Sequence, residues 1–356
     1  MKQNIIVCKP SDLTVPWAQR VIDKHHADAV VSNVNIVSVD IGTTTRVRIA
    51  IEHDGPDTLA RRWFVKLPSM ARRARIITAL PRLLHTEVRF YKEVAQSVPL
   101  VMPACLAAQS RFGMGSTLVL ADVAEFDAIP SYPNDTLTLA QATLVIEQLA
   151  RFHAHFWNKV DAEPTYRWLA GPVRRLEDHL GTALAVPLMK RGLRLAGSCI
   201  PSTLHAAAIH FARHRRKAMS FLSAAPQTLI HHDCHPGNLF WNRFQPGFLD
   251  WQLVRIGDGV GDVAYFMSTA LDPETRRLHE ASLLARYIQA LTDNGVVGMD
   301  NTVLMQRYRA HITYAFEAMV VTLAVGGMMN LDGNLELIRR TAAAVDDLDA
   351  FAALPI

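Results

Sequence analysis

The stretch Leu229-Ile-His-His-Asp-Cys-His-Pro-Gly-Asn-Leu-Phe-Trp241 decides how the rest of the sequence is interpreted. Its His-x-Asp pattern ends at Asp233, and Asn238 follows five positions later. A second stretch, Gly247-Phe-Leu-Asp-Trp-Gln252, is apolar up to Asp250. Short strands beside these stretches would hold the polar side chains on rigid backbone, and we expect them at 228–230, 239–241 and 247–249.

These residue types suit phosphoryl transfer. In that reaction one carboxylate accepts the proton of the attacking hydroxyl, while a second carboxylate and an amide oxygen hold the magnesium that neutralises the phosphates. Asp233 fits the first role, and Asp250 and Asn238 fit the metal-binding roles. Together the two stretches favour an enzyme that uses a nucleotide and magnesium.

The order H-x-D-x-x-x-x-N, followed by a strand that ends in Asp, resembles the protein-kinase-like superfamily. His235 lies two residues after Asp233, where protein kinases normally carry Lys. The run Asp-x-His-Pro-Gly-Asn resembles the aminoglycoside and choline phosphotransferase branch. Asp250-Trp-Gln is similar to the ecdysteroid-kinase-like members of that branch.

Two other interpretations of the first stretch remain open. A zinc cluster is conceivable, with ligands from His231, His232, Cys234 and His235. No second Cys/His group with metal spacing, such as CxxC or HExxH, accompanies them, which disfavours zinc. A loop with chance polar residues is the other alternative, but it leaves Asp250 without an explanation.

The composition describes a globular protein. The chain has 356 residues, of which 50% are hydrophobic. Its longest nearly apolar run, Ala318 to Met329, is shorter than the ~20 residues that span a bilayer, so we expect no membrane span. The N-terminus shows no signal-peptide pattern. Four scattered cysteines indicate reduced thiols and a cytoplasmic location.

The charge is distributed unevenly. Residues 1–229 are net basic and residues 230–356 are net acidic, and a basic first part suits a polyphosphate ligand. The basic runs Arg72-Arg73-Ala-Arg75 and Arg213-His-Arg-Arg-Lys217 lack interleaved aromatic residues. We interpret both runs as solvated surface and expect no nucleic-acid partner.

The first part of the chain has the pattern of a kinase N-lobe. We expect a helix from Thr14 to about His26, three antiparallel strands at 34–41, 45–52 and 61–67, and a helix at 83–98. Lys66 lies near the end of the third strand. The resemblance implies that Lys66 contacts the α- and β-phosphates and pairs with a helix Glu. Glu87 is our choice for that partner, and Glu93 competes with it.

The resemblance implies further nucleotide contacts. Gly42, Thr43 and Thr44 form the turn between the first two strands, where backbone N–H groups would approach phosphates. Two more strands are expected at 103–109 and 116–123, and the second would lead into an interlobe hinge. There the backbone at Ala121 would take the adenine edge.

The remainder of the chain is predicted to be mostly helical. We expect helices at 137–158, 202–222, 274–294, 301–328 and 335–352, with two short helices between 160 and 200. His153 is interpreted as a helix-packing residue. Asp262 matches the structural Asp of the superfamily at a helix start, and the resemblance implies that it caps the helix and braces the catalytic loop. An apolar stripe at helical spacing includes Tyr308 and Phe316, and it is either core or one wall of an acceptor site.

The sequence thus predicts an α+β, bilobal protein-kinase-like fold, with an antiparallel-sheet N-lobe at 1–125 and a larger, mostly helical C-lobe at 126–356. The implied activity is ATP- and magnesium-dependent transfer of the γ-phosphate to a hydroxyl of a small molecule. A nucleotide-binding pseudokinase is one alternative. A protein kinase is another, but only eleven residues separate Asp250 from Asp262 and no Ala-Pro-Glu occurs.

Overall fold

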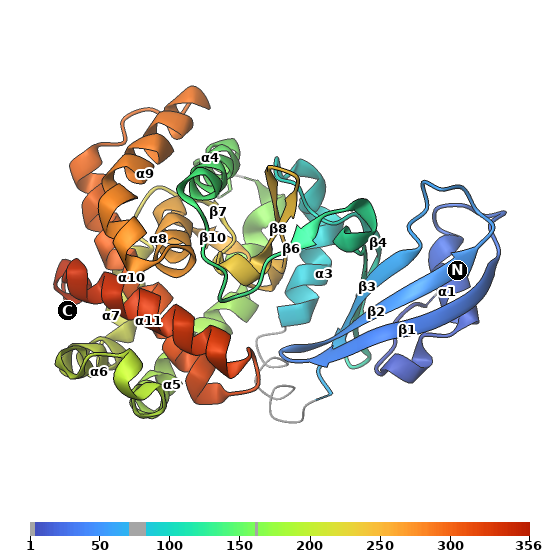
Figure 1. The fold of residues 1–356 in the computed structure, drawn as a ribbon, viewed down its shortest axis with the longest axis horizontal. Helices are drawn as coiled ribbons and strands as arrows, with labels where there is room; N and C mark the ends of the chain where they lie inside the picture. Colours follow the sequence, from blue (N-terminus) through green and yellow to red (C-terminus); the bar gives the residue numbers. More distant parts are fainter. Residues whose placement is uncertain (1–3, 71–82, 161–162) are drawn as a thin grey trace. The chain divides into compact units, whose positions relative to one another are not determined.

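A computed structural model describes residues 4–70, 83–160 and 163–356 (Figure 1). The chain forms two compact units. Unit 1 comprises Met1–Ser97, Val101–Pro130 and Phe248–Leu253, and unit 2 comprises Val98–Leu100, Ser131–Gly247 and Val254–Ile356. The basic run at Arg72-Arg73-Ala-Arg75 lies outside the described residues. None of the helices in the described part of the chain is long and apolar enough to cross a membrane.

Unit 1 contains the predicted antiparallel sheet, whose strands are ordered β1-β2-β3-β5-β4 (Figure 1). A turn at Gly42 and Thr43 joins the first two strands. The strands of this unit are β1 (Val31–Ile41), β2 (Thr44–His53), β3 (Arg62–Pro68), β4 (Cys105–Arg111), β5 (Gly115–Ala121) and the short β6 (Ile129–Pro130). The strands predicted in this region are therefore confirmed, with shifts of a few residues at their ends.

The alternation of β3 gives the sheet two different faces. Trp63, Val65 and Leu67 point into a hydrophobic core that also contains Trp17 of α1 (Val15–Ile22). The rings of Trp17 and Trp63 meet edge to face, with centroids 6.1 Å apart. Because successive side chains of a strand point to opposite faces, Lys66 projects from the other face.

Helix α3 (Leu83–Glu93) packs against β4 and β5 and carries the acidic partner of Lys66. The helix predicted for 83–98 ends earlier, and a short 3-10 turn, η2 (Ala95–Ser97), follows it. Asp250 and the 3-10 turn η8 (Trp251–Leu253) belong to this unit although they lie far along the sequence. Chain segments separated by more than a hundred residues therefore meet in unit 1.

Unit 2 is mostly helical (Figure 1). Its helices are α4 (Leu139–Phe156), α5 (Pro172–Ala196), α6 (His205–Arg213), α7 (Arg215–Leu222), α8 (Gly259–Ala270), α9 (Pro273–Asp293), α10 (Asn301–Val325) and α11 (Leu331–Asp347). Strand β7 (Thr228–Ile230) pairs antiparallel with β10 (Arg255–Gly257), and β8 (Leu239–Asn242) is followed by β9 (Gln245–Phe248). On α10, Tyr308, Ile312 and Phe316 are fully buried. The apolar stripe is therefore core.

Two predictions of helix boundaries in this unit are wrong. In the region where two short helices were predicted, the described residues form the 3-10 segment η4 (Pro164–Ala170) and then one long helix, α5. Pro187 and Gly192 both lie inside this helix, and tertiary packing sustains the helix across them. A Cβ at Gly192 would lie 2.4 Å from Val320, so glycine lets α5 approach α10 closely. The single helix predicted for 202–222 is instead divided into α6 and α7 at His214.

Asp258, rather than the predicted Asp262, caps α8. Its Oδ1 accepts a hydrogen bond of 2.9 Å from the N–H of Val260. Its Oδ2 accepts from His311 Nε2 at 2.8 Å and from Arg307 Nε at 2.8 Å. Burial alone would raise the pKa of Asp258, but His311 and Arg307 outweigh burial and lower it. The ionised carboxylate is therefore part of the folded structure.

We predict that Asp258→Asn lowers the free energy of unfolding at pH 7 by about 1.5–3 kcal/mol, the usual contribution of hydrogen bonds to a charged group. A carboxylate whose pKa is depressed on folding stabilises the fold above its unfolded pKa, and it loses this contribution as the pH falls through the folded value. The difference between wild type and variant should therefore shrink below the ordinary value of 3.8. Urea unfolding of both proteins at pH 7 and pH 3 measures this difference in the free energy of unfolding. A difference that is the same at both pH values would contradict the prediction.

Candidate active site

A buried lysine between two carboxylates forms the centre of the site in unit 1. Lys66 Nζ donates to Glu87 Oε1 at 2.8 Å and to Oε2 at 2.9 Å, and it lies 3.1 Å from Asp250 Oδ1. Lys66 is 3% exposed and Glu87 is fully buried. Glu93, the competing candidate, instead pairs with Arg89 on the surface of α3. The structure therefore brings together three of the residues predicted from sequence.

The ammonium of Lys66 and the two carboxylates stabilise each other's charged forms. Burial alone would lower the pKa of Lys66, but the carboxylates of Asp250 and Glu87 outweigh burial and raise it. Burial raises the pKa of Glu87, and the ammonium of Lys66 opposes that effect. Lys66 is therefore held as an ammonium ion, which is the form that binds phosphate oxygens.

Helix α3 also anchors the backbone that carries Asp250. Glu87 Oε1 accepts from the N–H of Trp251 at 3.2 Å. One turn later on the same helix face, Phe90 stacks on the Trp251 ring, with centroids 4.4 Å apart and planes inclined by 9°. Asp250 itself has φ 62°, a left-handed conformation that is uncommon for a residue other than glycine. The spacing of Glu87 and Phe90 explains this anchor, which the sequence analysis missed.

The predicted phosphate loop is a tight turn with internal hydrogen bonds. The N–H of Gly42 donates to the carbonyl of Thr44 at 3.0 Å, and Ser69 Oγ donates to the carbonyl of Gly42 at 2.7 Å. Thr44 is buried and Thr43 is half-buried. The N–H of Gly42 is thus already used within the turn, so any phosphate contact must come from other groups of the loop.

The backbone N–H groups at the predicted adenine contact, near Ala121, are also already used in hydrogen bonds within the fold. Ala121 is the last residue of β5, and its N–H donates to the carbonyl of Ala104 at 2.9 Å. The next N–H, from Asp122, donates to the carbonyl of Arg62 at 2.9 Å. Neither N–H is available to an adenine ring.

In unit 2, Asp233 is held by two neighbouring side chains. Its Oδ1 accepts a hydrogen bond of 2.7 Å from the Tyr265 hydroxyl, and its Oδ2 accepts one of 3.0 Å from Asn238 Nδ2. Asn238 Nδ2 also donates to the carbonyl of Asp233 at 2.8 Å. His235 Nε2 lies 3.9 Å from Asp233 Oδ1. The structure therefore brings Asp233 and Asn238 together, and it adds Tyr265, which sequence reasoning missed.

Asp262 braces the loop that carries Asp233, as expected. Its Oδ2 accepts from the N–H of His231 and its Oδ1 from the N–H of His232, both at 2.7 Å. His153 Nε2 lies 3.2 Å from Asp262 Oδ2, and the other ring nitrogen of His153 lies 2.8 Å from the Tyr287 hydroxyl. His232, whose N–H binds Asp262, has φ 69° and lies directly before Asp233.

We predict that Asp262→Asn lowers kcat more than it lowers nucleotide affinity. An amide has one accepting oxygen, so one of the two backbone N–H groups loses its partner, at a cost of about 1–3 kcal/mol. Asp272→Asn is the control for the loss of a carboxylate that binds backbone: Asp272 Oδ1 accepts from the N–H groups of Glu274 and Thr275 at the start of α9, so an amide oxygen can keep both. Steady-state kinetics and thermal unfolding of both variants provide the measurement. Equal effects of the two substitutions on kcat would contradict a role in bracing the loop.

Comparison with known proteins identifies the family. The sequence model of the phosphotransferase enzyme family matches residues 51–299, which is more than half of the chain. The chain belongs to this family. It is therefore an enzyme, a phosphotransferase whose acceptor group is a hydroxyl. A search of curated proteins returned no match.

Solved structures of low sequence identity have the same fold as this phosphotransferase. Aminoglycoside 2′-phosphotransferase-IIIa, in a GDP complex, is 14% identical, with a TM-score of 0.52 over 92% of this chain and 98% of that chain. Choline kinase from Cryptosporidium parvum Iowa II is 12% identical, with a TM-score of 0.56 over 91% of each chain. Ethanolamine kinase from Plasmodium vivax is 11% identical, with a TM-score of 0.51 over 94% of this chain and 89% of that chain. The predicted kinase-like α+β fold is confirmed.

The zinc interpretation finds no support in the phosphotransferase structure. Cys234 is fully buried, and burial raises the pKa of its thiol well above the ordinary value, which disfavours the thiolate that binds zinc. His231 Nδ1 accepts a hydrogen bond of 3.3 Å from the N–H of Asp233. Across residues 4–70, 83–160 and 163–356, no group of three or more His, Cys, Asp and Glu side chains is placed to hold a metal.

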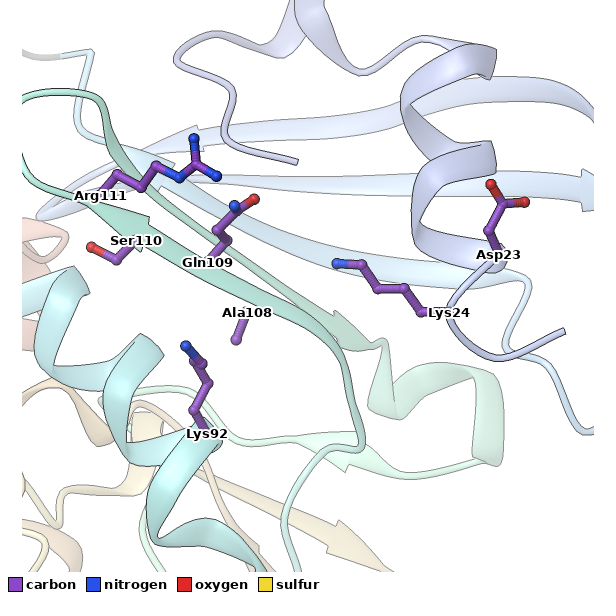
Figure 2. A pocket seen from close by; sticks show the side chains of 7 residues that line it. All are labelled: Asp23, Lys24, Lys92, Ala108, Gln109, Ser110 and Arg111. Atoms are coloured by element: carbon purple, nitrogen blue, oxygen red, sulfur yellow. The ribbon is translucent and has the colours of Figure 1, made fainter. Parts of the chain in front are cut away.

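Unit 1 also contains a hollow of about 540 Å³ that the residues of the candidate active site do not line (Figure 2). In Figure 2 the ammonium groups of Lys24 and Lys92 point toward the segment of β4 at Ala108 and Gln109. The residues that line the hollow are Asp23, Lys24, Lys92, Ala108, Gln109, Ser110 and Arg111. Neither Lys66, Glu87 nor Asp250 lines this hollow, so we do not assign it to the candidate active site.

Proposed function

We propose that this phosphotransferase moves the γ-phosphate of ATP to a hydroxyl group of a small molecule and requires magnesium. The observation that carries the proposal is the buried Lys66 ammonium between Glu87 and Asp250. A charge that is removed from water and fixed by two partners is a strong binder of phosphate oxygens, because it needs little reorganisation when the reaction occurs.

On the nucleotide side, Lys66 contacts the α- and β-phosphates and Glu87 keeps its ammonium in place. The backbone of the turn at Gly42, Thr43 and Thr44 approaches the phosphates, and the backbone near Ala121 receives the adenine. The hydrogen bonds already made by Gly42 and Ala121 limit which groups serve these roles. Mutation of side chains in the turn should therefore matter less than mutation of Lys66.

The residues proposed to hold magnesium fit that ion. Magnesium prefers carboxylate and amide oxygens, and it offsets the negative charge of the phosphates when it is bound. Asp250 offers a carboxylate beside Lys66. Asn238 directs its Nδ2 toward Asp233, and its Oδ1 makes no hydrogen bond among the described residues, so that oxygen is available as a ligand.

On the acceptor side, Asp233 accepts the proton of the attacking hydroxyl. The hydroxyl oxygen forms a bond to the γ-phosphorus, and the bond from that phosphorus to the bridging oxygen of ATP breaks. The products are ADP and the phosphorylated acceptor, and the proton passes to Asp233. Tyr265 and Asn238 hold the carboxylate during this transfer.

Several observations bear on the acceptor and the location. The short segment between Asp250 and Asp262 and the family both favour a small hydroxylated molecule over a protein. Asp250-Trp-Gln resembles ecdysteroid-kinase-like members, but the stripe on α10 is core and therefore does not support a lipophilic acceptor. The four cysteines are free thiols, which supports a cytoplasmic location.

The test is a screen of ADP release with ATP and with GTP as donors. The acceptor panel contains aminoglycosides, choline analogues, sterols and sugars, and a parallel reaction contains generic protein substrates. We expect magnesium-dependent ADP release with at least one small hydroxylated compound and none that depends on protein. Nucleotide binding without turnover across the panel would favour a pseudokinase, and protein-dependent release would favour a protein kinase.

A further inference from the structure

Helix α8 places the Tyr265 hydroxyl against Asp233. Asp262 and Tyr265 are three residues apart, so they lie on the same face of α8. Asp262 binds the backbone N–H groups of His231 and His232, and Tyr265 reaches the side chain of the next residue. One helix face thus holds both the backbone and the side chain of the loop.

We propose that Tyr265 is a positioning residue for phosphoryl transfer, which fixes the Asp233 carboxylate so that it receives the proton of the acceptor hydroxyl. This inference rests on the proposed function. The Tyr265 hydroxyl binds Oδ1 at 2.7 Å and the Asn238 amide binds Oδ2 at 3.0 Å. Each carboxylate oxygen has room for two hydrogen bonds, so both oxygens keep one accepting position.

The donor is held firmly. Tyr265 is 2% exposed, and its ring packs beside the Tyr314 ring at a centroid distance of 6.1 Å. Burial and the neighbouring Asp233 raise the pKa of Tyr265 well above its ordinary value, so the hydroxyl keeps its proton. Tyr265 is therefore a hydrogen-bond donor to the base and does not compete with Asp233 as a base.

Tyr265→Phe tests the role because it retains the buried ring and removes only the hydroxyl. Tyr308→Phe is a matched control. Tyr308 is fully buried in α10, and its hydroxyl donates to the carboxylate of Glu280 at 3.3 Å. Both substitutions therefore delete a hydrogen bond from a buried tyrosine to a carboxylate, but only one of them concerns the proposed base.

With an acceptor from the screen, we expect Tyr265→Phe to lower kcat about 10–100-fold, as the loss of a hydrogen bond to a charged group does when it acts in the transition state. The KM for ATP should stay within about twofold of wild type, because Lys66 and Asp250 are unchanged. Tyr308→Phe should leave both constants close to those of wild type. A merely structural role would produce similar kinetic effects in the two variants.

A second measurement does not need turnover. The ¹³Cγ resonance of Asp233 at neutral pH, assigned by its loss in Asp233→Asn, should shift in Tyr265→Phe and not in Tyr308→Phe. An unchanged resonance, or a kcat within twofold of wild type, overturns the positioning role. If the wild type phosphorylates no acceptor, the proposed function fails. In that case the Asp233 resonance still tests the contact with Tyr265. A shift in Tyr265→Phe supports the contact, and an unchanged resonance refutes the contact in addition to the proposed function.

Discussion

Asp250→Asn should reduce turnover about a thousandfold, because the neutral amide is a far weaker magnesium ligand than the carboxylate. A bound metal ion contributes several kcal/mol of charge stabilisation in the transition state, and each ~1.4 kcal/mol is a factor of ten in rate. Asparagine is the suitable replacement because Asp250 has φ 62°, a conformation that Asn tolerates better than Ala does. The fold should survive because Lys66 keeps Glu87 as a partner.

The measurement is kcat as a function of magnesium concentration, together with thermal unfolding. The variant should need more magnesium for half-maximal rate. Glu93→Gln is the control, since Glu93 is an exposed carboxylate of the same unit that pairs with Arg89. Near-normal activity of Asp250→Asn at low magnesium would remove Asp250 from the metal-binding role.

Asp233→Asn should lower kcat about 10²–10⁴-fold, the usual contribution of a placed proton acceptor. ATP affinity should change little, because Lys66 and Asp250 remain intact. The structure refines this expectation. Tyr265 and Asn238 both donate to Asp233, and an asparagine side chain offers only one accepting oxygen, so one donor loses its partner. A small loss of stability should therefore accompany the loss of rate.

Equilibrium ATP binding, ADP release with a working acceptor and metal content of wild type and Asp233→Asn test this prediction together. Asp332→Asn is a suitable control, because Asp332 lies in the first turn of α11 and has no role in the proposed reaction. Full activity of Asp233→Asn, or stoichiometric zinc in the wild type, would refute the assignment of the base.

Site residues could be predicted from sequence where they belong to a short motif or where a charged side chain lies on a predicted strand or helix. The strand of Lys66 and the helix of Glu87 were predicted from periodicity, and the family resemblance implied that the two residues pair. They are in contact. Asp262 was predicted to brace the loop, and it does so. The capping role was wrong because Asp258 and Asp262 both lie near the start of α8, and sequence alone does not distinguish the cap from the residue one turn later.

Contacts between distant segments could not be predicted in the same way. Trp251 and Phe90 are ordinary aromatic residues until the fold stacks one on the other. Tyr265 looks like a core residue of α8, and only the placement of that helix against the loop directs its hydroxyl to Asp233. The single long helix α5 was not predicted. Pro187 and Gly192 weaken a helix locally, and packing against α10 sustains it.

The most direct test of the central claim is single-turnover transfer from ATP labelled at the γ-phosphate, with excess enzyme, magnesium and an acceptor found in the screen. We predict that the label appears on a hydroxyl of the acceptor in a one-to-one ratio with ADP, and that Asp233→Asn slows this transfer. ADP formed without labelled acceptor, or transfer that is as fast in Asp233→Asn as in the wild type, would contradict the account.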